Sequence, residues 1–247
     1  MNIKTKQFQI LTDINLVWNF MTDIYDPYFA NGVAAPFFEY ALTSKWMDKE
    51  YLHLNRLWMA GDIVVGFVFT EAVVTSVFFN LRPGYEGLAD EMVEYAQNSF
   101  PDLGGERELV IFSGQKALIR AAEKEGYKVS YENADFLFDF RKSGLSYDLP
   151  EGFHFVDPLK CDLLKLAKCT WNSFNAEELG PFKNWNIPDS ETPWNPHKAY
   201  TGVVSSAVAP PPHATHEYNV IIADENEDYE CFSGMWWVPE NKLAYME

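Results

Sequence analysis

A glycine-containing turn between a strand and a helix is the stretch of this sequence best suited to binding a ligand. The turn reads Arg82-Pro83-Gly84-Tyr85-Glu86-Gly87-Leu88. Backbone N–H groups at the start of a helix have no partner within that helix, and the helix dipole favours negative charge there. The pattern therefore predicts an anion site suited to a diphosphate. An ordinary strand–helix loop has a similar composition, so this second interpretation stays open.

The turn lacks the lysine of a Walker motif and the three-glycine spacing of a Rossmann motif. The sequence therefore gives no support to nucleotide hydrolysis or to hydride transfer. Two other groups of residues could do chemistry. His213 and His216 could bind a metal together with Cys231, but their spacing matches no zinc framework, which favours solvated loop histidines and no metal. Trp185 and Trp194 could line a substrate groove or belong to the core.

Hydrophobic periodicity predicts the elements that position the turn. A helix with buried Leu88, Met92, Tyr95 or Ala96, and Phe100 follows it. Before the turn we expect a strand at Phe8–Leu11, a helix from about Leu16 to Ile24, a helix at Pro36–Trp46, and strands at Leu57–Ala60, Ile63–Phe69 and Val73–Phe79. After it we expect a strand at Glu108–Ser113, a helix at Gln115–Glu125 that ends at Gly126, and a strand at Phe136–Phe140.

Residues 142–151 are typical of a linker, and the remainder of the chain starts the same order of elements again. We expect a strand at Phe153–Val156, a helix at Cys161–Phe174, an irregular stretch from Leu179 to Thr215, and strands at Tyr218–Ala223, Tyr229–Trp237 and Leu243–Met246. The order resembles that of residues 59–77, which indicates an internal repeat. The second copy stops where the first has its turn and helix, so we expect a chain cut short in mid-domain.

These patterns predict an α+β fold in α/β/α layers. Residues 1–141 form a first module, and residues 152–247 form the first half of a second one. Each module is expected to hold a mixed, mainly antiparallel sheet with helices on both faces.

Composition limits the possible partners. Nineteen Lys and Arg oppose 36 Asp and Glu, a net charge of −17, which argues against nucleic-acid and anionic-membrane partners. No apolar run is long enough to span a membrane, and the three scattered cysteines suit a reducing compartment. We therefore expect a soluble, cytoplasmic protein. The sequence does not indicate its oligomeric state.

The order of elements, the position of the turn and the composition together resemble the GNAT superfamily of acetyl-CoA-dependent N-acetyltransferases, in particular bacterial proteins with two such modules in tandem. The run Val73–Phe79 resembles strand 4 of that family, Pro83–Ala89 its pyrophosphate turn, and Glu108–Ser113 its strand 5. The stretch Ala122–Lys128 resembles the end of its fourth helix. The resemblance implies that acetyl-CoA would contact Phe78, Phe79, Gly84, Tyr85, Gly87, Leu88 and Ala89.

The turn also departs from the family pattern. Glu86 stands where the family has Arg or Gln, and Ala89 and Glu91 replace later glycines. A carboxylate repels a pyrophosphate. We therefore expect the first module to bind acetyl-CoA weakly or not at all, and the second to be the active one.

The resemblance implies transfer of an acetyl group from acetyl-CoA to a primary amine of a small molecule or a peptide. A carboxylate would take the amine proton, and a tyrosine would protonate the departing thiolate. Glu247, at the end of the strand Leu243–Met246, is the candidate base, although an ordinary strand-end carboxylate remains an equal alternative. Tyr127 is the candidate acid. A non-catalytic module that binds a ligand or a protein is the alternative function.

Overall fold

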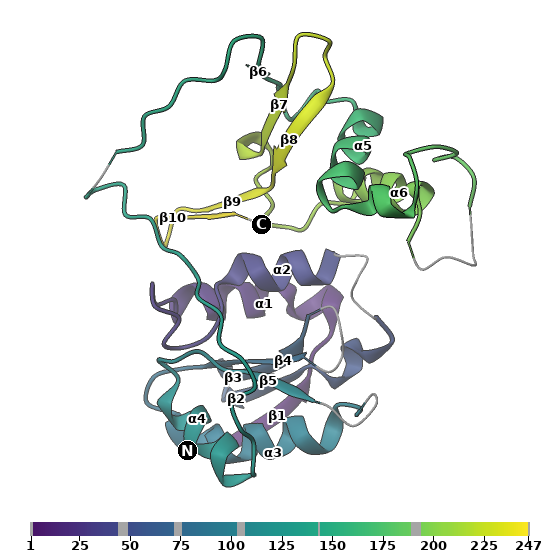
Figure 1. Ribbon diagram of the computed structural model, residues 1–247. Helices are drawn as coiled ribbons and strands as arrows, with labels where there is room; N and C mark the ends of the chain where they lie inside the picture. The colour runs from purple at the N-terminus through teal and green to yellow at the C-terminus, as the bar shows by residue number, and fades with distance from the viewer. Residues whose placement is uncertain are drawn as a thin grey trace. The chain divides into compact units, whose positions relative to one another are not determined.

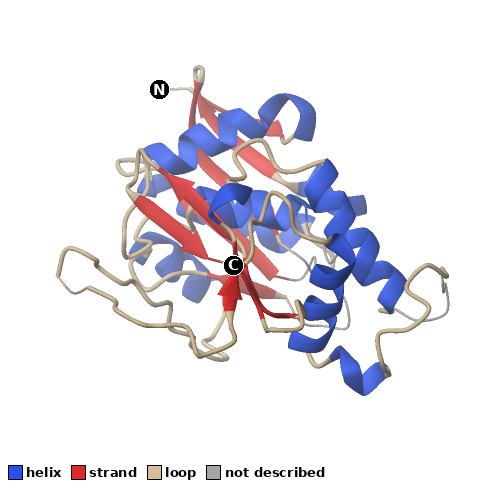
Figure 2. Ribbon diagram, turned by 90° about the horizontal axis from the view of Figure 1, so that it is seen from above, coloured by secondary structure: helices blue, strands red, loops and turns tan. Residues whose placement is uncertain are grey.

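Two units make up the chain, Met1–Asp139 and Phe140–Glu247, divided by the density of their internal contacts. The structure, a computed structural model, describes residues 2–43, 49–71, 76–102, 107–142, 144–188 and 194–246. Figure 2 shows the helices and strands of the chain by colour. Both kinds of element occur in each unit. The predicted mixed α+β class is therefore confirmed.

The N-terminal unit holds a single five-stranded sheet with the order β1-β2-β3-β4-β5 (Figure 1). Neighbouring strands are antiparallel except β4 and β5, which are parallel. The elements are β1 Ile3–Gln7, α1 Ile10–Asp23, α2 Ala35–Thr43, β2 Arg56–Ala60, β3 Ile63–Thr70, β4 Ser76–Leu81, α3 Ala89–Ser99, β5 Glu108–Val110 and α4 Lys116–Lys124, with short 3-10 turns at Lys49–Leu54 and Glu86–Leu88.

Alternation along the strands divides the core of this unit between two faces. Phe67, Phe69 and Phe78 pack against the rings of Phe37 and Phe38 on α2, at centroid distances from 4.8 to 6.4 Å. The other face carries a second buried cluster, to which β3 and β4 contribute Val68, Phe79 and Leu81, α3 contributes Met92 and Ala96, and α4 contributes Leu118 and Ala121. Helices α1 and α2 thus cover one face of the sheet, and α3 and α4 cover the other (Figure 1).

The C-terminal unit contains two small antiparallel sheets, β6-β7-β8 and β9-β10. Its elements are β6 His154–Phe155, α5 Leu163–Ser173, α6 Pro196–Val208, β7 Val220–Ala223, β8 Tyr229–Ser233, β9 Met235–Val238 and β10 Leu243–Met246, with 3-10 turns at Ala176–Leu179 and His216–Tyr218. The expected single strand Tyr229–Trp237 is instead divided at Gly234. Its first half pairs with β7 and its second half with β10.

Two expected strands are wrong. Phe8–Leu11 is not a strand, because Gln9 is already the N-cap residue of α1, which begins at Ile10. The Asp13 carboxylate accepts the Gln9 N–H at 2.9 Å and pairs with Lys6 at 2.5 Å. Phe136–Phe140 also forms no strand, and Phe136 is 97% exposed. A strand exists through its hydrogen bonds to neighbours, so apolar composition alone did not determine this segment.

The irregular stretch expected from Leu179 to Thr215 contains a full helix, α6. Its start has a standard sequence signal: Asn195 is the N-cap, its side chain accepts the Lys198 N–H at 2.9 Å, and Pro196 is the first helical residue. The high proline content of the region concealed this signal. Residues 44–48, at the expected end of α2, and Val73, at the expected start of β4, lie outside the described residues.

Candidate functional site

The turn after β4 is bound by a carboxylate of the chain itself. Gly84 adopts a positive φ of 87°, and its N–H donates to Oε1 of Glu86 at 2.9 Å. Hydrogen bonds from the Gly84 N–H and from the backbone N–H of Glu86 itself lower the pKa of that carboxyl group. Two of the donors that the sequence offered to a diphosphate, the N–H groups of Gly84 and Glu86, are therefore used by the Glu86 carboxylate.

The remaining turn residues have mainly structural roles. The Leu88 N–H donates to the Tyr85 carbonyl at 2.9 Å, and Leu88 is the N-cap residue of α3. The Glu91 carboxylate accepts the indole N–H of Trp58 at 2.7 Å, which ties α3 to β2. Glu91 replaces a glycine of the GNAT pattern, and its bond to Trp58 gives this carboxylate a structural role.

A pocket of about 230 Å³ lies beside the turn, between the start of α3 and α4. Small residues form part of its wall, among them Gly87 and Ala89. Charged side chains also line it. Lys124 pairs with Asp90 at 2.6 Å, and that hydrogen bond raises the pKa of the lysine. Arg120 is exposed and also lines this pocket.

The two phenylalanines expected to contact acetyl-CoA are core residues. Phe78 is 7% exposed and packs against Phe37, whereas Phe79 is 1% exposed and belongs to the cluster beneath α3. Their side chains are therefore buried on opposite faces of the sheet, and only the backbone of β4 could meet a ligand there.

That backbone borders an opening between β4 and β5, which we call the strand gap. The two strands pair from Ser76 to Phe78, but β4 continues to Leu81 without β5 beside it. The strand gap lies between Phe79–Leu81 on one side and Ile111–Phe112 on the other.

One side chain that the sequence did not single out spans the strand gap. Nε2 of Gln115 donates to the Phe79 carbonyl at 2.8 Å, and its Oε1 accepts the Phe112 N–H at 2.9 Å. Gln115 is 4% exposed. It is also the N-cap residue of α4, yet its side chain caps no N–H of that helix. Only its position between Gly114 and the helix could have drawn attention to it in the sequence.

The two predicted catalytic residues belong to different units. Tyr127 is half-buried, and its N–H donates to the Ala122 carbonyl at 3.0 Å in the turn that ends α4, where Gly126 has a φ of 90°. Its ring is not part of the wall of the pocket beside α3. Glu247 lies outside the described residues. Both assignments remain predictions.

Comparison with known proteins gives no identification. No family model, no curated protein and no solved structure matches the chain. Within the described ranges, no group of three or more His, Cys, Asp or Glu side chains is arranged to hold a metal ion. Over the same ranges, no helix has the length and apolar character needed to cross a membrane.

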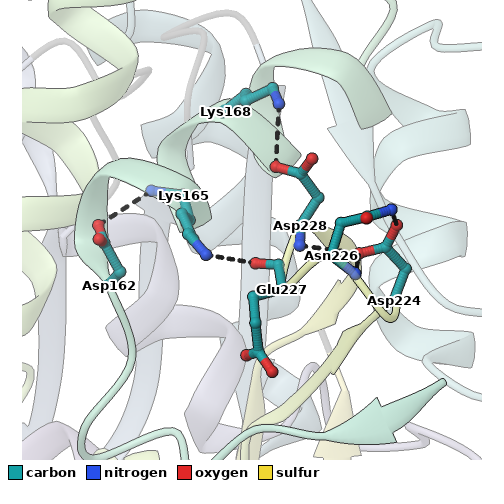
Figure 3. A network of polar contacts seen from close by, with 7 residues as sticks. All are labelled: Asp162, Lys165, Lys168, Asp224, Asn226, Glu227 and Asp228. Carbon is teal, nitrogen blue, oxygen red and sulfur yellow. Dashed lines mark hydrogen bonds and ion pairs between the residues drawn. The ribbon is translucent and has the colours of Figure 1, made fainter. Parts of the chain in front are cut away.

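In the C-terminal unit, polar groups join α5 to the turn between β7 and β8 (Figure 3). Asp162 accepts two N–H groups of the first turn of α5, at 2.8 and 3.2 Å. Lys165 donates to the Glu227 carbonyl at 2.5 Å, and Lys168 pairs with Asp228 at 3.2 Å. These groups bind one another, and the network is therefore structural.

The tryptophans of the long loop pack against helices of the same unit. Trp194 stacks on Trp171 of α5 at 6.5 Å, and Trp185 meets Tyr200 of α6 edge-on at 4.5 Å. His197 contacts the Trp185 carbonyl at 3.0 Å. These contacts favour the core interpretation of both tryptophans over a substrate groove.

Proposed function

We propose that this protein is an acetyl-CoA-dependent N-acetyltransferase of the GNAT type, which transfers an acetyl group to a primary amine of a small molecule or a peptide. One observation carries the proposal: a single parallel strand pair in an otherwise antiparallel sheet stops at Phe78, and a turn and the helix α3 follow the longer strand. The order of elements from β1 to α4 supports it as well, because it agrees with the order that the resemblance implies.

In this proposal the N-terminal unit does not bind acetyl-CoA, so the candidate acid Tyr127, which belongs to this unit, has no departing thiolate to protonate there. The Glu86 carboxylate places a negative charge on the turn and accepts the N–H groups of Gly84 and Glu86, and Gln115 occupies the strand gap. Neither place is open to a pyrophosphate or to an extended ligand, so the residues present do not fit acetyl-CoA in the way the family resemblance implies.

The chemistry is assigned to the C-terminal unit. Its order of strand, two helices and further strands parallels the order from β1 to β4, so β10 takes the place of β4. Glu247 directly follows β10 in sequence. An amine must lose a proton to attack a thioester productively, and a carboxylate at this position would accept that proton.

The experiment measures binding and turnover together. Calorimetry with acetyl-CoA, followed by detection of free CoA with a panel of amines, is expected to show binding and amine-dependent release of CoA. Glu247→Gln is expected to lower the rate by roughly 10²-fold or more, the usual range for a lost general base, with an unchanged melting temperature. The exposed Glu240 is the matched control, and Glu240→Gln should leave the rate unchanged. Absence of acetyl-CoA binding would sink the proposal.

A second function, ligand binding without catalysis, is favoured by the pocket beside α3. Arg120 and Lys124 both line it. Binding of acetyl-CoA that produces no free CoA, and that Arg120→Ala weakens, would support this alternative. Lys116→Ala is its control, because Lys116 is exposed on the same helix and does not line the pocket.

A further inference from the structure

The strand gap of the N-terminal unit presents two backbone groups that together match an amide. The Phe79 carbonyl on one side is an acceptor, and the Phe112 N–H on the other is a donor. A group that satisfies both needs one N–H and one C=O, which is the hydrogen-bonding inventory of a peptide or of any secondary amide. The carboxamide of Gln115 supplies this pair from within the chain.

The loop between α1 and α2 contacts both sides of the gap. The Leu81 N–H donates to the Asn31 carbonyl at 2.9 Å, and the ring of Phe29 lies 5.0 Å from that of Phe112. Two glycines permit this approach. A Cβ on Gly32 would lie 2.5 Å from the Phe79 oxygen, and one on Gly114 would lie 2.7 Å from Cα of Ala30. The loop therefore reaches the backbone on both sides of the gap.

Gln115 closes the turn that leads into α4, because its own N–H donates to the Phe112 carbonyl at 2.9 Å while its Oε1 accepts the Phe112 N–H. The side chain caps no N–H of α4, and the bond to the Phe79 carbonyl lies outside this turn. The Gln115 carboxamide lies at 4% exposure between β4 and the segment after β5. Both hydrogen bonds must break before any ligand amide can take its place.

We propose that Gln115 is an internal plug, a carboxamide that occupies the strand gap and excludes the amide-bearing arm of an acyl-CoA from the N-terminal unit. The inference rests on the proposed function for the identity of the excluded ligand. The contact made by Gln115 would then be autoinhibitory, because it would block acyl-CoA binding in the N-terminal unit.

The experiment compares wild type with Gln115→Ala and with Gln115→Asn, whose shorter side chain cannot span both partners. Gln7→Ala, at an exposed position of β1, is the control for loss of a glutamine. Acetyl-CoA and pantetheine are the probes. Calorimetry reports affinity, and hydrogen exchange reports the Phe112 N–H. In Gln115→Ala without ligand we expect this N–H to exchange on the order of tenfold faster, because its internal acceptor is lost. We expect both probes to bind the N-terminal unit of this variant on the order of tenfold more tightly, because the ligand no longer has to replace two internal hydrogen bonds. This binding is read as renewed protection of the Phe112 N–H at probe concentrations that leave wild type unchanged, so that it is separated from binding to the C-terminal unit.

Three results would overturn the plug. In the first, Gln115→Ala folds and exposes the Phe112 N–H, yet neither probe binds more tightly. In the second, acetyl-CoA already protects this N–H in wild type, a measurement that needs no variant to fold. In the third, Gln7→Ala produces the same gain. Tighter binding in Gln115→Ala without amine-dependent CoA release in any version would instead support the plug and contradict the proposed acetyltransferase.

Discussion

The two units follow a similar order of elements but build different sheets. In the N-terminal unit the hairpin strand β3 is continuous over Ile63–Thr70, and it pairs with β2 on one side and β4 on the other. In the C-terminal unit the corresponding strand breaks at Gly234, so that β8 and β9 belong to separate sheets. The comparison teaches that a similar order of elements does not ensure a similar sheet, because a break in one strand changes which strands pair.

The units also differ in what holds them together. The described core of the N-terminal unit includes tightly packed phenylalanine rings on one face of the sheet and a large cluster of both aliphatic and aromatic residues on the other. The aromatic cluster of the C-terminal unit is centred on Trp171, with Ala176 and Ala199 buried beside it. Partly exposed charges also link α5 to its hairpin (Figure 3). Burial is therefore expected to dominate the first unit, and polar contacts to contribute visibly to the second.

The largest expected effect tests burial in the N-terminal unit. Phe67 is fully buried and lies 4.9 Å from the ring of Phe69 and 5.1 Å from that of Phe38. Phe67→Ala should lower the free energy of unfolding by about 3–5 kcal/mol, from lost burial and the cavity left behind. Denaturant unfolding followed by tryptophan fluorescence measures it. Phe67→Leu should cost clearly less, and equal losses in the two variants would contradict a packing origin.

A matched pair of glycines tests the loop that contacts both sides of the strand gap. Gly32 and Gly61 both have positive φ, but a Cβ meets the Phe79 oxygen at 2.5 Å only at Gly32, whereas nothing lies within 4 Å at Gly61. Gly61→Ala should cost about 1 kcal/mol for its backbone conformation. Gly32→Ala should cost roughly 2–4 kcal/mol, because its φ of 122° is farther from the left-handed helical region than the 66° of Gly61, and overpacking adds to this strain. Thermal unfolding of both variants measures the two losses of stability. A smaller loss for Gly32→Ala than for Gly61→Ala would refute the close approach.

A pH titration tests the polar turn of the C-terminal unit. Oδ1 of Asp224 accepts the N–H groups of Asn226 and Asp228, each at 2.9 Å. Hydrogen bonds from the Asn226 side chain, and then from these backbone groups, lower the pKa of the Asp224 carboxyl group below its ordinary value of 3.8. The stabilisation is therefore complete above that ordinary value and is lost as the pH falls through the lowered pKa. Amide chemical shifts of the turn should follow this loss.

Asp224→Asn provides the control for this titration, because its amide oxygen accepts hydrogen bonds without titrating. If the amide shifts of wild type and Asp224→Asn respond to pH in the same way, another group is responsible.

The smallest expected effect concerns the pair between Lys168 and Asp228. Both side chains are 49% exposed, so solvent and salt screen their attraction. A double-mutant cycle with Lys168→Met and Asp228→Asn should give a coupling below about 0.5 kcal/mol. That coupling should vanish in high salt. A coupling several times larger would show that polar contacts dominate the C-terminal unit more strongly than its exposure suggests.

The sequence by itself determined the elements whose signals are local. The strand Leu243–Met246 has its predicted bounds, and the helix α4 ends at Lys124, just before Gly126 with its positive φ, as a glycine after a helix indicates. The mixed α+β class followed from the same patterns. The start of helix α6 also has a local sequence signal, Asn195 followed by Pro196. The other prolines of this region favour an irregular segment, and the two signals conflict.

Only the tertiary structure decided what depends on distant neighbours. The segment Phe136–Phe140 could be a strand only if a neighbouring strand paired with it, and it forms no strand. The sheet as a whole determined that β4 and β5 separate after Phe78. The hydrogen bonds that Glu86 and Gln115 form at the candidate site also depended on the tertiary structure. Glu86 accepts the N–H of its own turn, and Gln115 joins β4 to a segment more than thirty residues away in sequence. Residue types established that these groups can form hydrogen bonds, but their partners depended on which backbone groups the fold brings within reach.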